Sequence, residues 1–227
     1  MATQVYKTLA KIVGVVLLLV GLAALVGGNF AHGFVTEQLE DQQITMPTEQ
    51  AIDGQVESGR ISAEDAEVLR PYAGETMATG NHAQAFADHY IRAHMTAAAK
   101  AAGVPEEQAS YSGLVALVTE KTTALKEELA ALPENSGKSE QEIAALAAAE
   151  IADPATEYEN AKQAASLQQL RMDTFLDGNT LRGMLLNAYG WWLVGTIAIA
   201  AGIGLLVVGA LLLVFGFVLK PRAVATT

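Results

Sequence analysis

The chain has 227 residues, of which 51% are hydrophobic, and a formal net charge of −11 at pH 7. Such an acidic balance argues against an anionic partner, such as nucleic acid or acidic lipid head groups. The chain has no cysteine, which excludes disulfides, thiolate catalysis and lipid-modified cysteines.

The first predicted element is a membrane-spanning helix at residues 12–29. Its core, Ile12–Gly28, contains no charged residue and no histidine. As a helix this core rises about 25 Å, so it crosses a hydrocarbon layer of about 30 Å if Thr8–Ala10 join it and Lys7 and Lys11 extend their amino groups toward the interface. The alternative is a cleaved signal peptide with a weak cleavage site at residues 31–33.

Residues 30–187, between the two apolar runs, predict one alanine-rich helical domain. Residues 30–58 lack helical periodicity and are expected to pack as an extended strap. Ser62 and Asp65 form a capping-box pattern for a short helix, which must end before Pro71.

The next helix is expected to begin at Thr79 or Asn81 and to end at Gly103, since glycine is favoured just after a helix. Pro105 suits the first turn of a third helix, because a proline there loses no hydrogen bond. This helix must end before Pro133.

A turn is predicted at residues 133–137, where proline, asparagine, serine and glycine cluster. Ser139 and Glu142 then predict a second capping box and an alanine-rich helix. The last helix of the domain is expected to start at residues 153–154. It is expected to run, with a break at residues 177–179, into the second apolar run.

The second predicted span occupies residues 188–219. Its core, Trp191–Leu219, has no charged residue and no histidine and rises about 43 Å, more than a bilayer needs. No polar or ionisable group is expected at mid-membrane depth except Thr196, which is near the outer edge, so no proton relay or ion pathway is predicted. Three aromatic residues are expected to anchor the outer interface: Tyr189, Trp191 and Trp192.

The charge distribution predicts the orientation. All 25 Asp and Glu residues lie between Glu37 and Asp177, against 10 Lys and Arg residues between the spans, so the central segment carries −15. The flanks, residues 1–11 and 220–227, carry four basic residues and no acidic one. Positively charged flanks stay inside, so both termini are expected in the cytoplasm and the acidic domain outside the inner membrane.

Glycine recurs every seven residues in both apolar runs. This period keeps small residues on one stripe of a slightly supercoiled helix, where two backbones can approach closely in lipid. The two spans are therefore expected to pack antiparallel through these stripes, and contact of a stripe with another protein is the alternative. The glycines are Gly14, Gly21, Gly28, Gly195, Gly202, Gly209 and Gly216.

Three histidines on one predicted helix are the weak candidates for a metal site. His82 and His89 share a face but lie two turns, about 10 Å, apart. His94 is five residues after His89, so an ion would need a further ligand, such as Glu75. The three are expected to be surface or core residues instead.

The sequence lacks the motifs of other common catalytic and phosphate-binding sites. No glycine-rich phosphate loop and no Gly-x-Ser-x-Gly motif occurs in the sequence. Asp88 and Arg92, four residues apart on a helix, are expected to pair on its surface. The sequence therefore predicts no catalytic residue and no cofactor.

Three stretches carry a resemblance to a known family. Residues 71–74 (Pro-Tyr-Ala-Gly), the stretch Gly80–Ile91 with His94, and Thr180–Trp192 resemble two-span membrane proteins of Actinobacteria. The similarity covers nearly the whole chain, with residues 104–160 loosely matched. Members of this family are often labelled aromatic ring-opening dioxygenases, but such an enzyme needs two histidines and a carboxylate converging on iron. The resemblance implies a source and a topology, and no catalytic residue.

These patterns favour a non-catalytic accessory or scaffold subunit of a larger membrane complex, with other integral membrane subunits as partners. Among actinobacterial assemblies, the fused cytochrome bc–cytochrome oxidase supercomplex is the preferred host. The alternative is an extracytoplasmic protein of the cell envelope that binds a ligand or lipid. A metal-dependent enzyme using the three histidines ranks third.

Overall fold

The computed structural model describes residues 2–218 and builds this part of the chain from helices, with one isolated antiparallel bridge between Thr45 and Thr76. The prediction of an all-α protein is therefore confirmed. The chain divides into two compact units. Unit 1 comprises Met1–Thr45, Glu75–Ala83 and Leu186–Thr227, and unit 2 comprises Met46–Gly74 and Gln84–Leu185.

Helix α1 (Ala2–Glu40) has 39 residues and reaches well beyond the first apolar run. The predicted extended strap at residues 30–58 is wrong, because α1 covers its beginning and α2 (Glu49–Glu57) covers its end. Nothing in the last part of α1 interrupts a helix, since it contains no proline. Val35 and Leu39 are only 3% and 2% exposed, so this part also has an apolar face to bury.

Helix α9 (Asp177–Val218) has 42 residues and contains most of the second apolar run. It follows directly on α8 (Glu159–Gln169) and the π-helical segment η5 (Leu170–Leu176). The predicted flank 220–227 and Leu219 lie outside the described residues.

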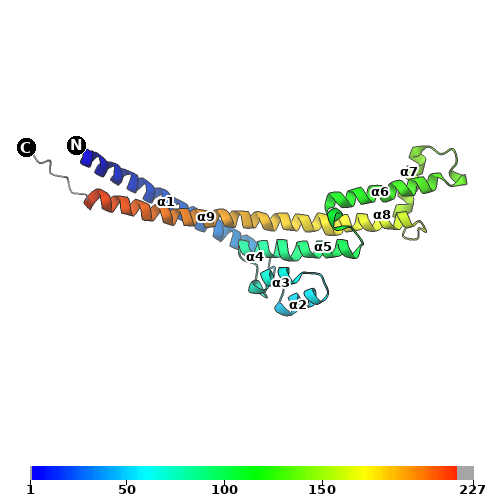
Figure 1. Cartoon of the computed structure of the whole chain (residues 1–227), viewed down its shortest axis with the longest axis horizontal. Coiled ribbons are helices and arrows are strands. Elements are labelled where there is room, and N and C mark those ends of the chain that lie inside the picture. The colour runs from blue at the N-terminus through cyan, green and yellow to red at the C-terminus, as the bar shows by residue number, and fades with distance from the viewer. Residues whose placement is uncertain (1, 219–227) are drawn as a thin grey trace, which may run out of the picture. The chain divides into compact units, whose positions relative to one another are not determined.

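Two helices of the described chain, Gln4–Glu40 and Glu159–Val218, are long and apolar enough to cross a membrane, by length and composition. They also carry most of the large apolar side chains that the structure leaves exposed, such as Leu19 at 64%, Val26 at 64% and Leu211 at 62%. Figure 1 shows α1 running alongside the C-terminal part of α9. The lipid boundaries predicted at residues 12–29 and 188–219 stay predictions.

Unit 2 contains most of the shorter helices. Helix α6 packs against α8 and α7, and Figure 1 shows α6 lying along α8. In chain order the elements between α2 and α8 are α3 (Ala63–Leu69), η1 (Arg70–Tyr72), α4 (Gly80–Ala85), η2 (Phe86–Ile91), α5 (Arg92–Ala101), η3 (Glu106–Gln108), α6 (Tyr111–Ala130), η4 (Pro133–Asn135) and α7 (Glu140–Ala152).

Two apolar clusters of buried side chains hold unit 2 together. Each draws on helices that are far apart in the sequence, as expected for the core of a helical domain. The first consists of Met95, Ala99, Val104, Leu114, Leu167 and Phe175. The second consists of Leu125, Leu129, Ile143, Ala147 and Ala161.

Several predicted helix ends are confirmed. Ser62 with Asp65, and Ser139 with Glu142, each form both hydrogen bonds of a capping box, at the starts of α3 and α7. Thr79 caps the start of α4, its hydroxyl accepting from the His82 amide at 3.2 Å. These ends depend on residues within one helical turn, which is why the sequence predicts them.

The predicted starts of two other helices are wrong. Pro105 leads only into the short 3₁₀ turn η3, and α6 begins later, where Ser110 is extended and its hydroxyl accepts from the Gly113 amide at 3.0 Å. Asp153 closes α7 rather than opening the next helix, and its carboxylate accepts from the Ala155 amide at 2.8 Å. Ser110 supplies α6 with a side-chain cap, which Pro105 cannot do, and the Asp153 carboxylate bonds to the turn that follows α7.

The predicted break at residues 177–179 is also wrong, because α9 passes through Gly178 without interruption. A Cβ at Gly178 would lie 2.6 Å from the sulfur of Met95, so this glycine permits close packing inside unit 2. The irregularity of this long helix is instead η5, seven residues of π-helix just before α9.

Candidate functional site

The glycines of the seven-residue repeat lie at the contact between α1 and α9 in unit 1. A Cβ on any of the three α1 glycines would come within 2.6–2.9 Å of a glycine carbonyl oxygen on α9. Real Cβ atoms essentially never approach closer than 3.0 Å, and a backbone oxygen cannot swing away. Only glycine therefore fits. The pairs are Gly14 with Gly209, Gly21 with Gly202 and Gly28 with Gly195.

Glycines outside the repeat behave differently. Gly27 and Gly204 are exposed, and nothing lies within 4 Å of a Cβ built on either one. The glycines of the repeat are buried instead. The contact therefore uses one stripe of each helix and not glycine in general.

Each contact also includes a side chain from the residue four positions after an α1 glycine. The γ-carbons of Leu18 and Leu25 lie 3.1 Å and 3.0 Å from Cβ positions built on the opposing α9 glycines. His32 occupies the same place after Gly28, and its Cδ2 lies 2.6 Å from the Cβ position of Gly195. The contact is thus a series of layers, and His32 belongs to the last of them.

The layer at the other end contains Lys11. Its Cγ lies 2.8 Å from the Cβ position of Gly216, and its ammonium lies 3.9 Å from the ring centroid of Phe217. The aliphatic stem therefore packs against the stripe, while the charged group contacts an aromatic face, which attracts a cation.

His32 joins α1 to α9 through polar and aromatic contacts. Its ring stacks on Trp192 with 3.9 Å between ring centroids and an interplanar angle of 7°. His32 Nε2 lies 3.0 Å from both Trp192 O and Thr196 Oγ1, and the Thr196 hydroxyl donates to that same carbonyl at 3.0 Å. Because the Thr196 proton is used in this way, both oxygens accept, and His32 Nε2–H is the donor.

The three predicted interface anchors differ in their surroundings. Trp191 is 56% exposed, Tyr189 is partly buried, and Trp192 carries the His32 stack. A Cβ at Gly80 would overlap Trp192, so the segment Glu75–Ala83 packs on this indole. Trp192 therefore contacts both α1 and the segment Glu75–Ala83 within unit 1. The interfacial role of the three aromatic residues stays a prediction.

Each of the three candidate histidines has its own partner. His82, in unit 1, is 8% exposed; its Nδ1 accepts from the Ala78 amide at 3.3 Å, and its Nε2 lies 3.3 Å from Glu75. His94, in unit 2, lies 2.7 Å from Tyr90 O and 3.0 Å from Gln55 Oε1. Within the described residues, no three histidine or acidic side chains converge to hold a metal ion.

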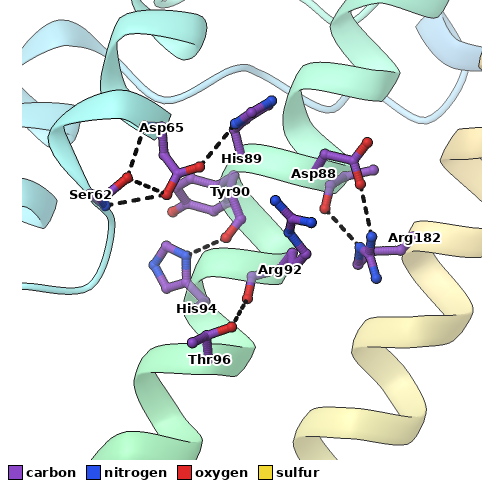
Figure 2. Close-up of polar contacts among 10 residues, drawn as sticks. Ser62, Asp65, Asp88, His89, Tyr90, Arg92, His94, Thr96 and Arg182 are labelled. Atoms are coloured by element: carbon purple, nitrogen blue, oxygen red, sulfur yellow. Dashed lines mark hydrogen bonds and ion pairs between the residues drawn. The ribbon is translucent and has the colours of Figure 1, made fainter. Parts of the chain in front are cut away.

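His89 belongs to a trio with Ser62 and Asp65 (Figure 2). Asp65 Oδ1 lies 2.9 Å from His89 Nδ1, and Asp65 Oδ2 accepts from the Ser62 hydroxyl at 2.6 Å. In a hydrolase triad the histidine lies between the serine and the carboxylate and takes the serine proton. Here the carboxylate is in the middle, so this trio stabilises the fold and does not activate a nucleophile.

The trio also shifts the pKa of Asp65. Partial burial raises the pKa of this carboxyl, but hydrogen bonds from Ser62 and His89 outweigh that effect and hold the pKa below its ordinary value. The ionised form of Asp65 is therefore favoured in the folded protein.

Asp88 does not pair with Arg92 as predicted, since its partner is Arg182 (Figure 2). Arg182 donates to Asp88 Oδ1 at 2.8 Å and, through Nε, to the Ala87 carbonyl at 3.0 Å. Asp88 and Ala87 lie in the π-helical segment η2, which changes the direction of side chains relative to an α-helix. A prediction based on α-helical spacing could not find this pair.

Sequence reasoning missed His32, Asp65 and Arg182 as connecting residues. One signal for His32 is present in the sequence, because it follows a repeat glycine by four residues, as Leu18 and Leu25 do. No such signal exists for the other two, whose partners come from distant segments.

Comparisons with protein-family models, curated proteins and solved structures found no match to this chain.

Replacing Gly202 by valine is expected to destabilise the helix pair, and replacing Gly204 is not. A Cβ at Gly202 would lie 2.8 Å from the Gly21 carbonyl oxygen, whereas nothing lies within 4 Å of one at Gly204. Overpacking costs about 1–3 kcal/mol, so the melting temperature of the full chain in neutral detergent should fall for G202V only. Equal melting temperatures for the two variants would contradict this contact.

Replacing Asp65 by asparagine is expected to lower the melting temperature at neutral pH and to have little effect in acid. The pKa of Asp65 is lower in the folded than in the unfolded chain, so its stabilising effect is complete above its unfolded value of 3.8. The effect is lost as the pH falls through the lowered folded pKa. Melting curves of both proteins between about pH 7 and pH 2 measure this, with Glu67→Gln on the same helix as the control. A difference that grows on acidification would refute the assignment.

Proposed function

We propose that the protein spans the cell's inner membrane twice and serves as a non-catalytic accessory or scaffold subunit of a larger membrane complex. The two long helices cross as an antiparallel pair, residues 1–11 and 220–227 lie in the cytoplasm, and residues 30–187 lie outside. The observation that carries the proposal is the layered contact of α1 with α9. It buries glycine backbones and leaves large apolar side chains exposed all around the pair.

The order of the glycine pairs supports the antiparallel arrangement. The residue numbers of the partners rise along α1 from Gly14 to Gly28 and fall along α9 from Gly209 to Gly195. In lipid, apolar surface gives no drive between helices, and close backbone contact through small residues supplies the attraction. A helix pair of this design suits a membrane rather than water.

The accessory role is supported by the distribution of polar side chains. Between the Lys11 and His32 layers, both helices carry apolar and small residues apart from Asn29 and Thr196, with no ionisable group. Transport of protons or ions normally requires such groups within the membrane. The exposed apolar faces fit lipid or other integral subunits, and following the resemblance, the actinobacterial cytochrome bc–oxidase supercomplex is the preferred host.

A second role, extracytoplasmic binding of a ligand or lipid, is favoured by one observation. Unit 2 contains clefts of about 530 Å³ and 840 Å³ beside α5. Volumes of this order are typical of small-molecule sites. A subunit role and a ligand site are compatible in one protein.

The proposed orientation predicts which side of the membrane a cysteine label reaches. Because the chain has no cysteine, Glu134→Cys and Gln4→Cys each introduce a single thiol at an exposed residue. A membrane-impermeant maleimide should label E134C in intact spheroplasts and should label Q4C only after permeabilisation. The opposite pattern would overturn the orientation.

The subunit role predicts a stoichiometric membrane partner. The full-length protein is given a C-terminal tag and extracted from native membranes in mild detergent. It should migrate as a large complex, and mass spectrometry should identify the same integral subunits in each preparation. Untagged membranes treated in the same way are the control. Migration as a free monomer without a stoichiometric partner would refute the role, and recovery of a partner outside the respiratory chain would refute the host.

A further inference from the structure

Two adjoining clefts in unit 2 form one groove beside α5. The first, of about 530 Å³, is lined on one side by residues 59–62 with Asp65, and the second, of about 840 Å³, by residues 58–60 with Thr174. Gly59, Arg60, Ala97 and Lys100 line both clefts. We name the two clefts together the Arg60 groove.

The Arg60 groove gathers positive charge in an otherwise acidic domain. Arg60, Arg92 and Lys100 line it, which makes three of the 10 basic residues between the two apolar runs. None of the three takes part in an ion pair among residues 2–218, where arginines 70 and 182 do. In Figure 2 the only dashed line at Arg92 runs from its backbone to Thr96.

The cations outnumber the acidic residues of the groove, since three cations and two carboxylates line the first cleft. Asp65 already accepts from Ser62 and His89, at 2.6 Å and 2.9 Å. Glu106 is the other acidic residue of the first cleft, and the lining of the second cleft includes none. His94 also lines the second cleft, but both of its ring nitrogens are already engaged, by Tyr90 O and Gln55 Oε1, so it adds no donor to those of the three cations.

The floor of the groove consists of small residues of α5. Alanine side chains there leave room for a ligand close to the helix and bury no competing polar group. The floor residues are Ala93, Ala97, Ala98 and Ala101.

We propose that the Arg60 groove binds an anionic ligand through a phosphate group held by Arg60, Arg92 and Lys100. The planar fork of arginine matches the oxygens of phosphate, and lysine adds a mobile point charge. Since the domain as a whole is acidic, long-range attraction does not draw anions to it, and binding depends on contacts within the groove. This inference does not rest on the accessory role.

The test uses the full chain in neutral detergent, with glycerol phosphate as the soluble probe and titration calorimetry as the measurement. Saturable binding is expected, and the double variant R60Q/K100Q is expected to weaken it at least about tenfold, because two charged hydrogen-bond donors are lost. The control, K138Q/K162Q, changes the net charge equally at exposed residues outside the groove and should bind like the wild type.

A steric variant tests whether binding depends on the shape of the groove as well as on its charge. Ala97→Leu keeps every cation but places a larger side chain on the floor shared by both clefts, so it should weaken binding as well. Circular dichroism and melting curves establish that each variant is folded.

A comparison of two lipids identifies whether the bound phosphate belongs to a lipid head group or to a soluble ligand. The wild type and R60Q/K100Q are compared in nanodiscs of phosphatidylglycerol and of phosphatidylcholine, and retained lipid is counted by native mass spectrometry. Phosphatidylglycerol retained by the wild type and lost in the variant assigns a lipid head group, and glycerol phosphate binding without lipid retention assigns a soluble ligand. Absence of both, or equal losses in the control variant, would overturn the proposal.

Discussion

The contact between α1 and α9 depends on glycine at every seventh residue, because a Cβ at any of these glycines would come closer than 3.0 Å to an atom of the opposing helix, in most cases a backbone carbonyl oxygen. The residue four positions later then packs over the opposing glycine, as Leu18 and Leu25 do. Each layer thus combines backbone contact with one side chain. In lipid, where burial of apolar surface gives no gain, this close packing is the available source of attraction.

The end layers of this contact differ from the middle ones. Lys11 and His32 take the places that leucines take between them, and each reaches an aromatic ring of α9, Phe217 and Trp192. His32 also bonds to a carbonyl and a hydroxyl of α9. Polar groups therefore occur where the contact ends, and the interior stays apolar. This distribution suits a membrane anchor that holds its helices together without a path for ions.

Unit 2 uses its polar side chains differently. Most of the described ion pairs there join separate segments, as Asp65 with His89 and Asp88 with Arg182 do, so they connect elements of the unit. The three cations Arg60, Arg92 and Lys100 instead line the Arg60 groove beside small residues. The proposed membrane anchor in unit 1 and the proposed groove in unit 2 use different residues, so the subunit and ligand-binding roles are compatible.

The sequence alone determines the helical class, the capping boxes at Ser62 and Ser139, and the positions of the repeat glycines, because these depend on residues within one or two turns. The tertiary structure decides the rest. His32 and Trp192 are 160 residues apart, and Asp88 finds Arg182 through a π-helical segment that no spacing rule anticipates. The groove likewise exists only because a loop folds beside α5. Local hydrogen bonds form between residues a few positions apart, so the sequence offers few alternatives. Which distant residues come into contact is decided by how the helices pack.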